Sequence, residues 1–244
     1  MQNAAFRAMG LSAVYVPLKC SAADVPPLLR GIARSGGGGN ITVPHKETAA
    51  RAVDVCRELA EVVEACNTFW SEDGRIVGDN TDVPAVLEVL YQLEAPAAPW
   101  LIAGTGGGAR AAVIAARDFG VPVAVRSRNA ERQRQFETWI ESRGVALAEE
   151  EECAVLINST PLGLTAGDPF PIEPDNFPRA EVAFDMVYVP GETSWVRAMR
   201  SRVRRAADGR TMLVAQGAAA FERWFPTKRA PVEVMRAAVN VALR

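Results

Sequence analysis

Hydrophobic and polar positions alternate in short stretches over the first part of the chain and predict a strand–helix–strand unit. The predicted elements are a strand at 13–16, a helix over about 24–33 and a strand at 40–43. Glycines at 36–39 break the pattern before the second strand. A βαβ unit is therefore expected to begin the fold, with Lys46 at the junction between its second strand and the next helix.

A hairpin is predicted next, because Asp73-Gly74 favours a tight turn between expected strands at 67–70 and 75–77. An apolar-periodic helix over 83–93 follows the hairpin. The residues at 94–99 include two prolines and interrupt the periodic pattern. This break is expected to lie close to a domain boundary.

From residue 100 onwards, predicted strands and helices alternate regularly. The strands are expected at 100–103, 121–125, 153–158 and 182–187, and the helices between them at about 108–119 and 129–142. Such alternation predicts a parallel sheet covered by helices on both faces. Two last helices, over about 212–224 and 232–242, are expected to return to the first part of the fold.

The length of 244 residues is compatible with one large domain or with two smaller ones. We predict an α/β fold with two domains and a cleft between them. The expected boundaries are 1–83 for a substrate and catalytic domain, 84–208 for a Rossmann-type, doubly wound parallel sheet, and 209–244 for helices that return to the first domain.

Composition narrows the class of protein. Hydrophobic residues make up 49% and charged residues 23%, as in ordinary globular proteins, and the net charge of −2 gives no general attraction for nucleic acid or anionic membranes. No apolar run has membrane-spanning length and the first residues lack a signal pattern, so a cytoplasmic location is expected. The four cysteines lack CxxC spacing and there is one histidine, so no metal site is expected. The expected partners are small molecules, and the protein is expected to be a monomer or homodimer.

A glycine-rich loop follows the predicted strand at 100–103. Gly104, Gly106 and Ala109 fit the spacing G-x-G-x-x-[G/A], in which small residues let backbone amides approach a pyrophosphate at the start of a helix. The spacing alone also fits a turn built for packing or a site for S-adenosylmethionine. The loop therefore indicates a dinucleotide site without establishing one.

The end of the next predicted strand favours NADP over NAD. Sites for NAD and S-adenosylmethionine usually offer an acidic residue to the ribose there, whereas this chain has Arg126-Ser127-Arg128-Asn129. Guanidinium groups suit a 2′-phosphate because they form charge-assisted hydrogen bonds. The alternative is that these arginines are only exposed polar residues.

Lys46 and Asp82 are candidates for acid–base chemistry. Lysine is a cation at neutral pH and can donate to a carbonyl oxygen while hydride adds to the carbon, and a nearby carboxylate would hold it in place. The alternative is a surface lysine at a helix start and an aspartate that caps a helix. Asn67, Thr68 and Gln216 are neutral polar residues with apolar neighbours that could orient a hydroxyl group, although such residues also serve turns and helix faces.

Seven ordered segments resemble the shikimate dehydrogenase family. They are Asn40-Ile41-Thr42-Val43-Pro44-His45-Lys46, Asn67-Thr68, Gly78-Asp79-Asn80-Thr81-Asp82, the loop from Gly104 to Arg110 with Ser127-Arg128-Asn129 after it, Asn158-Ser159-Thr160-Pro161-Leu162-Gly163, Asp185-Met186-Val187-Tyr188, and Met212-Leu213-Val214-Ala215-Gln216. The resemblance covers nearly the whole chain. It implies NADPH-dependent, reversible reduction of 3-dehydroshikimate to shikimate, a step in aromatic amino-acid biosynthesis.

The resemblance also implies roles for individual residues. Lys46 and Asp82 would be the catalytic pair. Substrate binding falls to Thr42, Asn67, Tyr188 and Gln216. Cofactor binding falls to Gly104, Thr105, Gly106, Gly107, Gly108, Ser127, Arg128, Asn129, Thr160 and Met212.

The chain departs from the family pattern at its start. Family members begin with a strand and a Ser-x-Ser segment that binds the substrate carboxylate, whereas Met1 falls within the helix that follows. Two other readings are therefore weighed: a quinate-type substrate, and an NADP-binding protein without turnover. Asp79, Ser194 and Trp195 are smaller departures outside the expected catalytic roles, and Trp195 is expected to cover the sheet.

Overall fold

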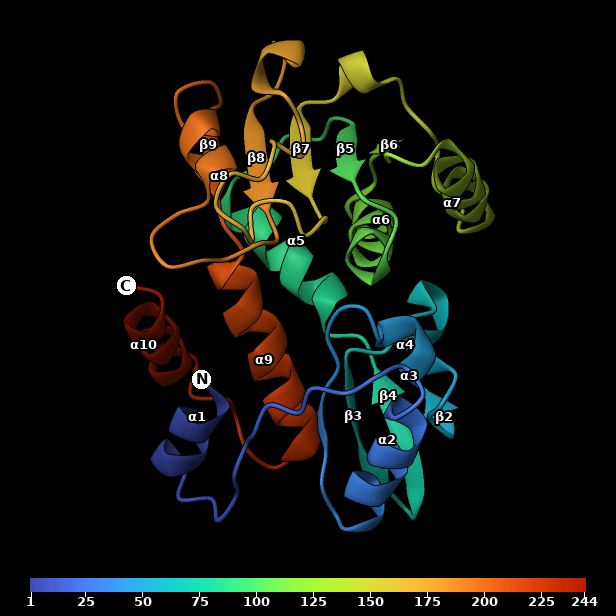
Figure 1. Ribbon diagram of the computed structural model, residues 1–244, viewed down its shortest axis with the longest axis vertical. Helices are drawn as coiled ribbons and strands as arrows, with labels where there is room; N and C mark the ends of the chain where they lie inside the picture. The colour runs from blue at the N-terminus through green and yellow to red at the C-terminus, as the bar shows by residue number, and fades with distance from the viewer. The chain divides into compact units, whose positions relative to one another are not determined.

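The computed structural model describes residues 1–244 and contains two compact units (Figure 1). The first unit consists of residues 1–82 and 213–242, and the second of residues 83–212 and 243–244. The chain thus leaves the first unit directly after Asp82 and returns to it at Leu213. None of the helices combines the length and apolar character needed to cross a membrane.

The first unit is built on a small four-stranded sheet. Its strands are β1 (Gly39–Asn40), β2 (Val55–Cys56), β3 (Thr68–Glu72) and β4 (Arg75–Asp79), in the order β1-β3-β4-β2. Its helices are α1 (Gln2–Ala8), α2 (Val25–Arg34), α3 (Lys46–Ala50), α4 (Glu58–Val63), α10 (Val232–Ala242) and the greater part of α9 (Arg210–Trp224). The predicted hairpin is confirmed, since β3 and β4 are antiparallel and the turn between them holds Asp73 and Gly74 at positive φ.

The predicted strand at 13–16 is wrong, and with it the βαβ unit. The segment is irregular, and the backbone N–H and C=O of Tyr15 both bond to the side-chain amide of Asn3, at 2.7 and 2.8 Å. Alternation is present, because the Tyr15 ring stacks on Trp224 while Val14 is 77% exposed. The predicted second strand shortens to β1, so Lys46 follows a loop and begins α3.

The second unit contains the predicted parallel sheet. Its strands are β5 (Trp100–Ala103), β6 (Val123–Arg126), β7 (Val155–Asn158), β8 (Val182–Asp185) and β9 (Arg205–Ala207), in the order β6-β5-β7-β8-β9. Its helices are α5 (Asp82–Gln92), α6 (Gly107–Phe119), α7 (Ala130–Ser142) and α8 (Ser194–Met199), with short 3₁₀ turns at Glu150–Glu152 and Pro174–Asn176. Every neighbouring pair is parallel, and the chain runs from β5 outward to β6 before crossing back to β7. The order of strands therefore reverses beside β5, where parallel sheets bind ligands.

A continuous apolar core supports this sheet. Trp195 on α8 is almost fully buried among residues such as Leu101 and Leu156 of the sheet, and its indole N–H donates to the Ile172 carbonyl at 2.8 Å. The expectation that Trp195 covers the sheet is confirmed. The carboxyl ends of β5, β7 and β8 are held in one register, so the residues that follow these strands lie at one edge of the sheet.

Candidate active site

Lys46 and Asp82 meet in the first unit. The Lys46 Nζ lies 2.6 Å from Asp82 Oδ2, and the two side chains are 15% and 4% exposed. Lys46 is held at the start of α3, where its carbonyl accepts the N–H of Cys66 at 2.9 Å, and Asp82 follows the end of β4. The pair is therefore a largely buried ion pair.

Asn67 orients the carboxylate of this pair from the other side. Its side-chain amide donates to Asp82 Oδ1 at 2.8 Å and to Thr81 Oγ1 at 3.0 Å, and its Oδ1 accepts the backbone N–H of Thr81 at 2.8 Å. Both oxygens of Asp82 are thus engaged, one by Lys46 and one by Asn67. An ammonium group held by a fixed carboxylate in this way can serve as a proton donor to an oxygen atom.

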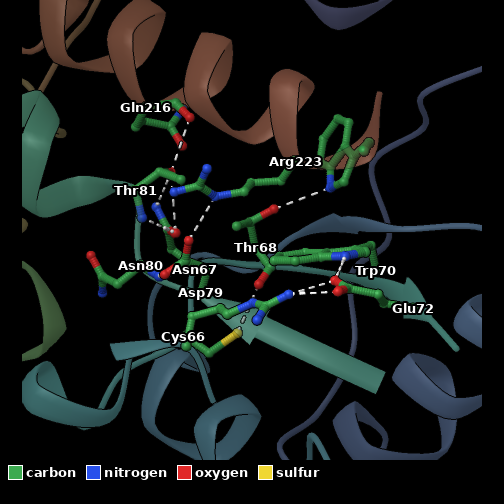
Figure 2. Close-up of polar contacts among 12 residues, drawn as sticks. Cys66, Asn67, Thr68, Trp70, Glu72, Asp79, Asn80, Thr81, Gln216 and Arg223 are labelled. Carbon is green, nitrogen blue, oxygen red and sulfur yellow. Dashed lines mark hydrogen bonds and ion pairs between the residues drawn. The ribbon is translucent and has the colours of Figure 1, made fainter. Parts of the chain in front are cut away.

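Gln216 lies beside the same turn, on α9 (Figure 2). Its backbone carbonyl accepts the Thr81 hydroxyl at 3.0 Å, and its half-buried side chain donates to the Leu213 carbonyl at 2.9 Å. Thr42 is exposed in the loop before α3. Tyr188, which is 40% exposed, belongs to the second unit, as does the buried Met212.

The glycine loop of the second unit is shaped by close packing after β5. Gly104 has φ +114°, and a Cβ there would lie 2.5 Å from Ser159 Oγ, which donates to the Ala103 carbonyl at 2.6 Å. A Cβ on Gly108 would lie 3.2 Å from the Met186 sulfur. By contrast, a Cβ on Gly106 would meet open space, and no side chain caps the start of α6. The loop therefore presents the positive end of a helix that a phosphate group can approach.

The segment after β6 presents only one available guanidinium group, not the two suggested by the sequence. Arg126 pairs with Glu150 and lies over the Phe177 ring at 5.1 Å. Arg128 is exposed and makes no ion pair. Asn129 caps α7 by accepting the Arg132 N–H at 2.9 Å, so part of this segment serves the helix start.

A buried carboxylate that the sequence did not single out lies at the end of β8. Asp185 accepts hydrogen bonds from the Asn158 amide and the Thr193 hydroxyl, both at 2.8 Å, and from the Val187 N–H at 3.0 Å. Burial raises the pKa of Asp185 to about 6, against the effect of these hydrogen bonds. The Asn158 Oδ1 in turn accepts the N–H and hydroxyl of Thr160 at 2.9 and 2.7 Å. The sequence could have indicated Asp185 by its position, because it ends a strand of the parallel sheet whose neighbouring strand ends at Asn158.

The titratable thiols and possible metal ligands do not form a further centre. All four cysteines are free, and burial raises the pKa of both Cys66 and Cys153 to about 12. No group of three or more His, Cys, Asp or Glu side chains is arranged to hold a metal ion. The polar chemistry of the structure is therefore concentrated at the ion pair and at the strand ends of the parallel sheet.

A parallel sheet with a glycine turn at its reversal point, in a chain that also carries a largely buried lysine–aspartate ion pair, is typical of a dinucleotide-dependent oxidoreductase. Residues 1–69 match the family model for the shikimate dehydrogenase substrate binding domain, and residues 209–239 match that for the shikimate 5′-dehydrogenase C-terminal domain. Together with relatives that are 35% identical over 90% or more of the chain, these matches show that the chain belongs to the shikimate dehydrogenase family.

Relatives and solved structures agree over most of the chain. The shikimate dehydrogenase (NADP(+)) of Methylocella silvestris is 35% identical over 232 residues, covering 90% of this chain and 82% of that protein. That of Paramagnetospirillum magneticum is 35% identical over 245 residues, covering 95% and 88%. The shikimate 5-dehydrogenase of Thermus thermophilus, in complex with NADP(H) and shikimate, is 30% identical with a TM-score of 0.89, covering 99% of this chain and 93% of that one.

Proposed function

We propose that this protein catalyses the NADPH-dependent, reversible reduction of 3-dehydroshikimate to shikimate. The observation that carries the proposal is the buried pair of Lys46 and Asp82, 2.6 Å apart and held by Asn67, in a chain of this family. In this proposal the first unit binds the substrate and the second unit binds the cofactor.

The residues of the pair would handle the proton. NADPH, when bound, supplies the hydride that adds to the carbonyl carbon. Lys46 donates a hydrogen bond to the carbonyl oxygen and delivers the proton that this oxygen gains, so the product is the neutral alcohol. Asp82 stabilises the ammonium group and aligns it. In the reverse direction the hydroxyl proton returns through Lys46.

Other side chains would orient the substrate without adding charge. Asn67, whose amide is engaged by Thr81 and Asp82, would line the substrate site, and Gln216 lies beside the same turn, where its backbone carbonyl accepts the Thr81 hydroxyl. Thr42, exposed in the loop before α3, and Tyr188 of the second unit complete the proposed set.

The second unit fits an NADP molecule by its own geometry. The uncapped start of α6 and the open space at Gly106 suit the pyrophosphate, with Gly104, Thr105, Gly107 and Gly108 forming the rest of the turn. Arg128, with the neighbouring Ser127 and Asn129, would hold the 2′-phosphate. Thr160, oriented by Asn158, and Met212 would line the nicotinamide side.

The test is oxidation of shikimate by NADP⁺ with the purified chain, followed by the absorbance of the NADPH formed. Quinate and NAD⁺ are run in parallel, and direct binding of NADPH is measured separately. Turnover of shikimate with NADP⁺ supports the proposal. Turnover of quinate but not of shikimate would mean that the substrate is of the quinate type. NADPH binding without any turnover would favour a non-catalytic protein.

Replacing Arg128 by alanine is expected to weaken NADPH binding by roughly 10- to 100-fold and to leave NADH binding nearly unchanged. The expected size follows from hydrogen bonds to a charged group, which contribute about 1.5–3 kcal/mol each. Fluorescence titration with both cofactors measures the two Kd values. Arg117→Ala, at an exposed ion pair near the other end of α6, is the matched control. If the Arg128 variant bound NADPH and NADH with equally reduced affinity, Arg128 would not be the residue that holds the 2′-phosphate.

A further inference from the structure

Asp79 is a buried carboxylate directly before the turn that carries Asp82. Its side chain is 4% exposed at the end of β4, and its Oδ1 accepts the backbone N–H of Asn80 at 2.8 Å. Its other oxygen, Oδ2, accepts the Nε–H of Arg223 at 2.8 Å. A carboxylate removed from water requires a cation or several donors, and Arg223 supplies the cation here.

Arg223 is part of a contact between α9 and the hairpin (Figure 2). The next residue on α9, Trp224, donates its indole N–H to the Thr68 hydroxyl at 3.1 Å. Thr68 and Asp79 stand opposite one another in the register of β3 and β4. Two consecutive residues of α9 thus hold the two members of one cross-strand pair.

This cross-strand pair is connected to the Lys46–Asp82 ion pair by short hydrogen bonds. The Asp79 carbonyl accepts the N–H of Asn67 at 3.0 Å, and Asn67 holds Asp82 Oδ1. A second connection runs through Asn80. Asp79 accepts the backbone N–H of Asn80, and the Asn80 side chain accepts the N–H of Asp82 at 3.0 Å. A shift of Asp79 would therefore move the Asn67 amide that holds the Asp82 carboxylate and the Asn80 oxygen that holds the Asp82 backbone N–H.

We propose that Arg223 is a positioning residue for the reduction, acting through Asp79 to hold the turn from Asn80 to Asp82. The inference rests on the proposed function for its kinetic consequence, whereas the geometry of the turn is independent of it. Arg223 does not need to touch the substrate in this role. Its Nε serves Asp79 while half of its side chain is exposed.

The two partners differ in what their loss leaves behind. Arg223→Met leaves a buried carboxylate without its cation, whereas Asp79→Asn leaves a half-exposed guanidinium that water can solvate. The asparagine also keeps the oxygen that accepts the Asn80 N–H. We therefore expect Arg223→Met to be much more harmful than Asp79→Asn, and Asp79→Asn to rescue it when the two are combined.

The experiment compares kcat and KM for shikimate in the wild type, Arg223→Met, Asp79→Asn and the double variant. Arg223→Met is expected to lower kcat by about 10- to 100-fold, the cost of a small misplacement of catalytic groups, with little change in KM. The double variant is expected to return to within about threefold of Asp79→Asn. Arg229→Met, at an exposed pair with Glu222 on the same unit, is the matched control and should behave as wild type.

Amide hydrogen exchange of Thr81 and Asp82 provides a readout that needs no turnover. Arg223→Met should accelerate exchange at both amides, and the double variant should restore protection. An unchanged kcat and unchanged exchange in Arg223→Met would overturn the inference. So would a raised KM for shikimate that Asp79→Asn does not rescue, because that result means direct contact with the substrate. A wild type without turnover would reject the proposed function alone, and the exchange data would still decide the role of Arg223.

Discussion

Replacing Lys46 by methionine should lower kcat for shikimate oxidation by about 10²- to 10⁴-fold, the range of general acid–base assistance. Methionine keeps an unbranched side chain that is one atom shorter but removes the ammonium group that lies 2.6 Å from Asp82. NADPH binding should not change, because the glycine turn and Arg128 belong to the second unit. Steady-state kinetics and a fluorescence titration with NADPH measure the two effects separately.

Lys19 provides the control for this substitution. It is exposed and lies outside the site, so Lys19→Met should retain wild-type kinetics. A kcat of Lys46→Met close to that of the wild type would remove Lys46 from the mechanism. A joint loss of kcat and NADPH affinity would show that the variant is misfolded.

Replacing Asp185 by asparagine should change how stability depends on pH. The folded protein raises the pKa of Asp185 from 3.8 to about 6, so between these values the folded state binds a proton that the unfolded state releases. Stability due to this group is therefore present at low pH and is lost as pH rises toward 6 and above. Relative to the wild type, the variant should gain up to about 3 kcal/mol between pH ~4 and ~7.

Denaturant unfolding at a series of pH values measures this difference. Asp175→Asn, at a side chain that is 79% exposed, is the control and should follow the wild type at every pH. A constant difference between Asp185→Asn and the wild type would mean that Asp185 titrates alike in both states. A variant that loses relative stability as pH rises would show that the native state favours the carboxylate, contrary to the effect of burial.

The parallel sheet could be predicted from the sequence because its buried strands are short apolar runs that alternate regularly with helices. Trp100–Ala103, for example, is an uninterrupted apolar run followed by a glycine turn and a long periodic helix. The first unit has weaker signals. Its α3, α4 and β2 contain five, six and two residues, which are too few to show a period. The run at 13–16 has the alternation of a strand, but its backbone groups bond to Asn3, which no local pattern indicates.

The residues of the site also differ in whether the sequence alone could indicate them. Lys46, Asn67 and Asp82 lie in short motifs that resemble those of a known family, so they could be named before the structure. Arg223 could not, because its partner Asp79 is 144 residues away in sequence and an arginine near the end of a helix resembles any other surface arginine. The sequence also could not show that Arg126 is engaged while Arg128 is available, because Arg126 and its partner Glu150 are brought together only by the fold.

The discontinuity of the first unit also sets the order in which the chain can fold on the ribosome. Residues Val83–Met212 of the second unit have all been synthesised before Leu213–Ala242, the stretch that completes the first unit. That late stretch includes Arg223 and Trp224, so the hairpin emerges long before the helix that holds it. Domains commonly fold from the amino-terminal end during synthesis. Here all but the last two residues of the unit that carries the glycine turn are synthesised before the unit that opens the sequence receives its final stretch.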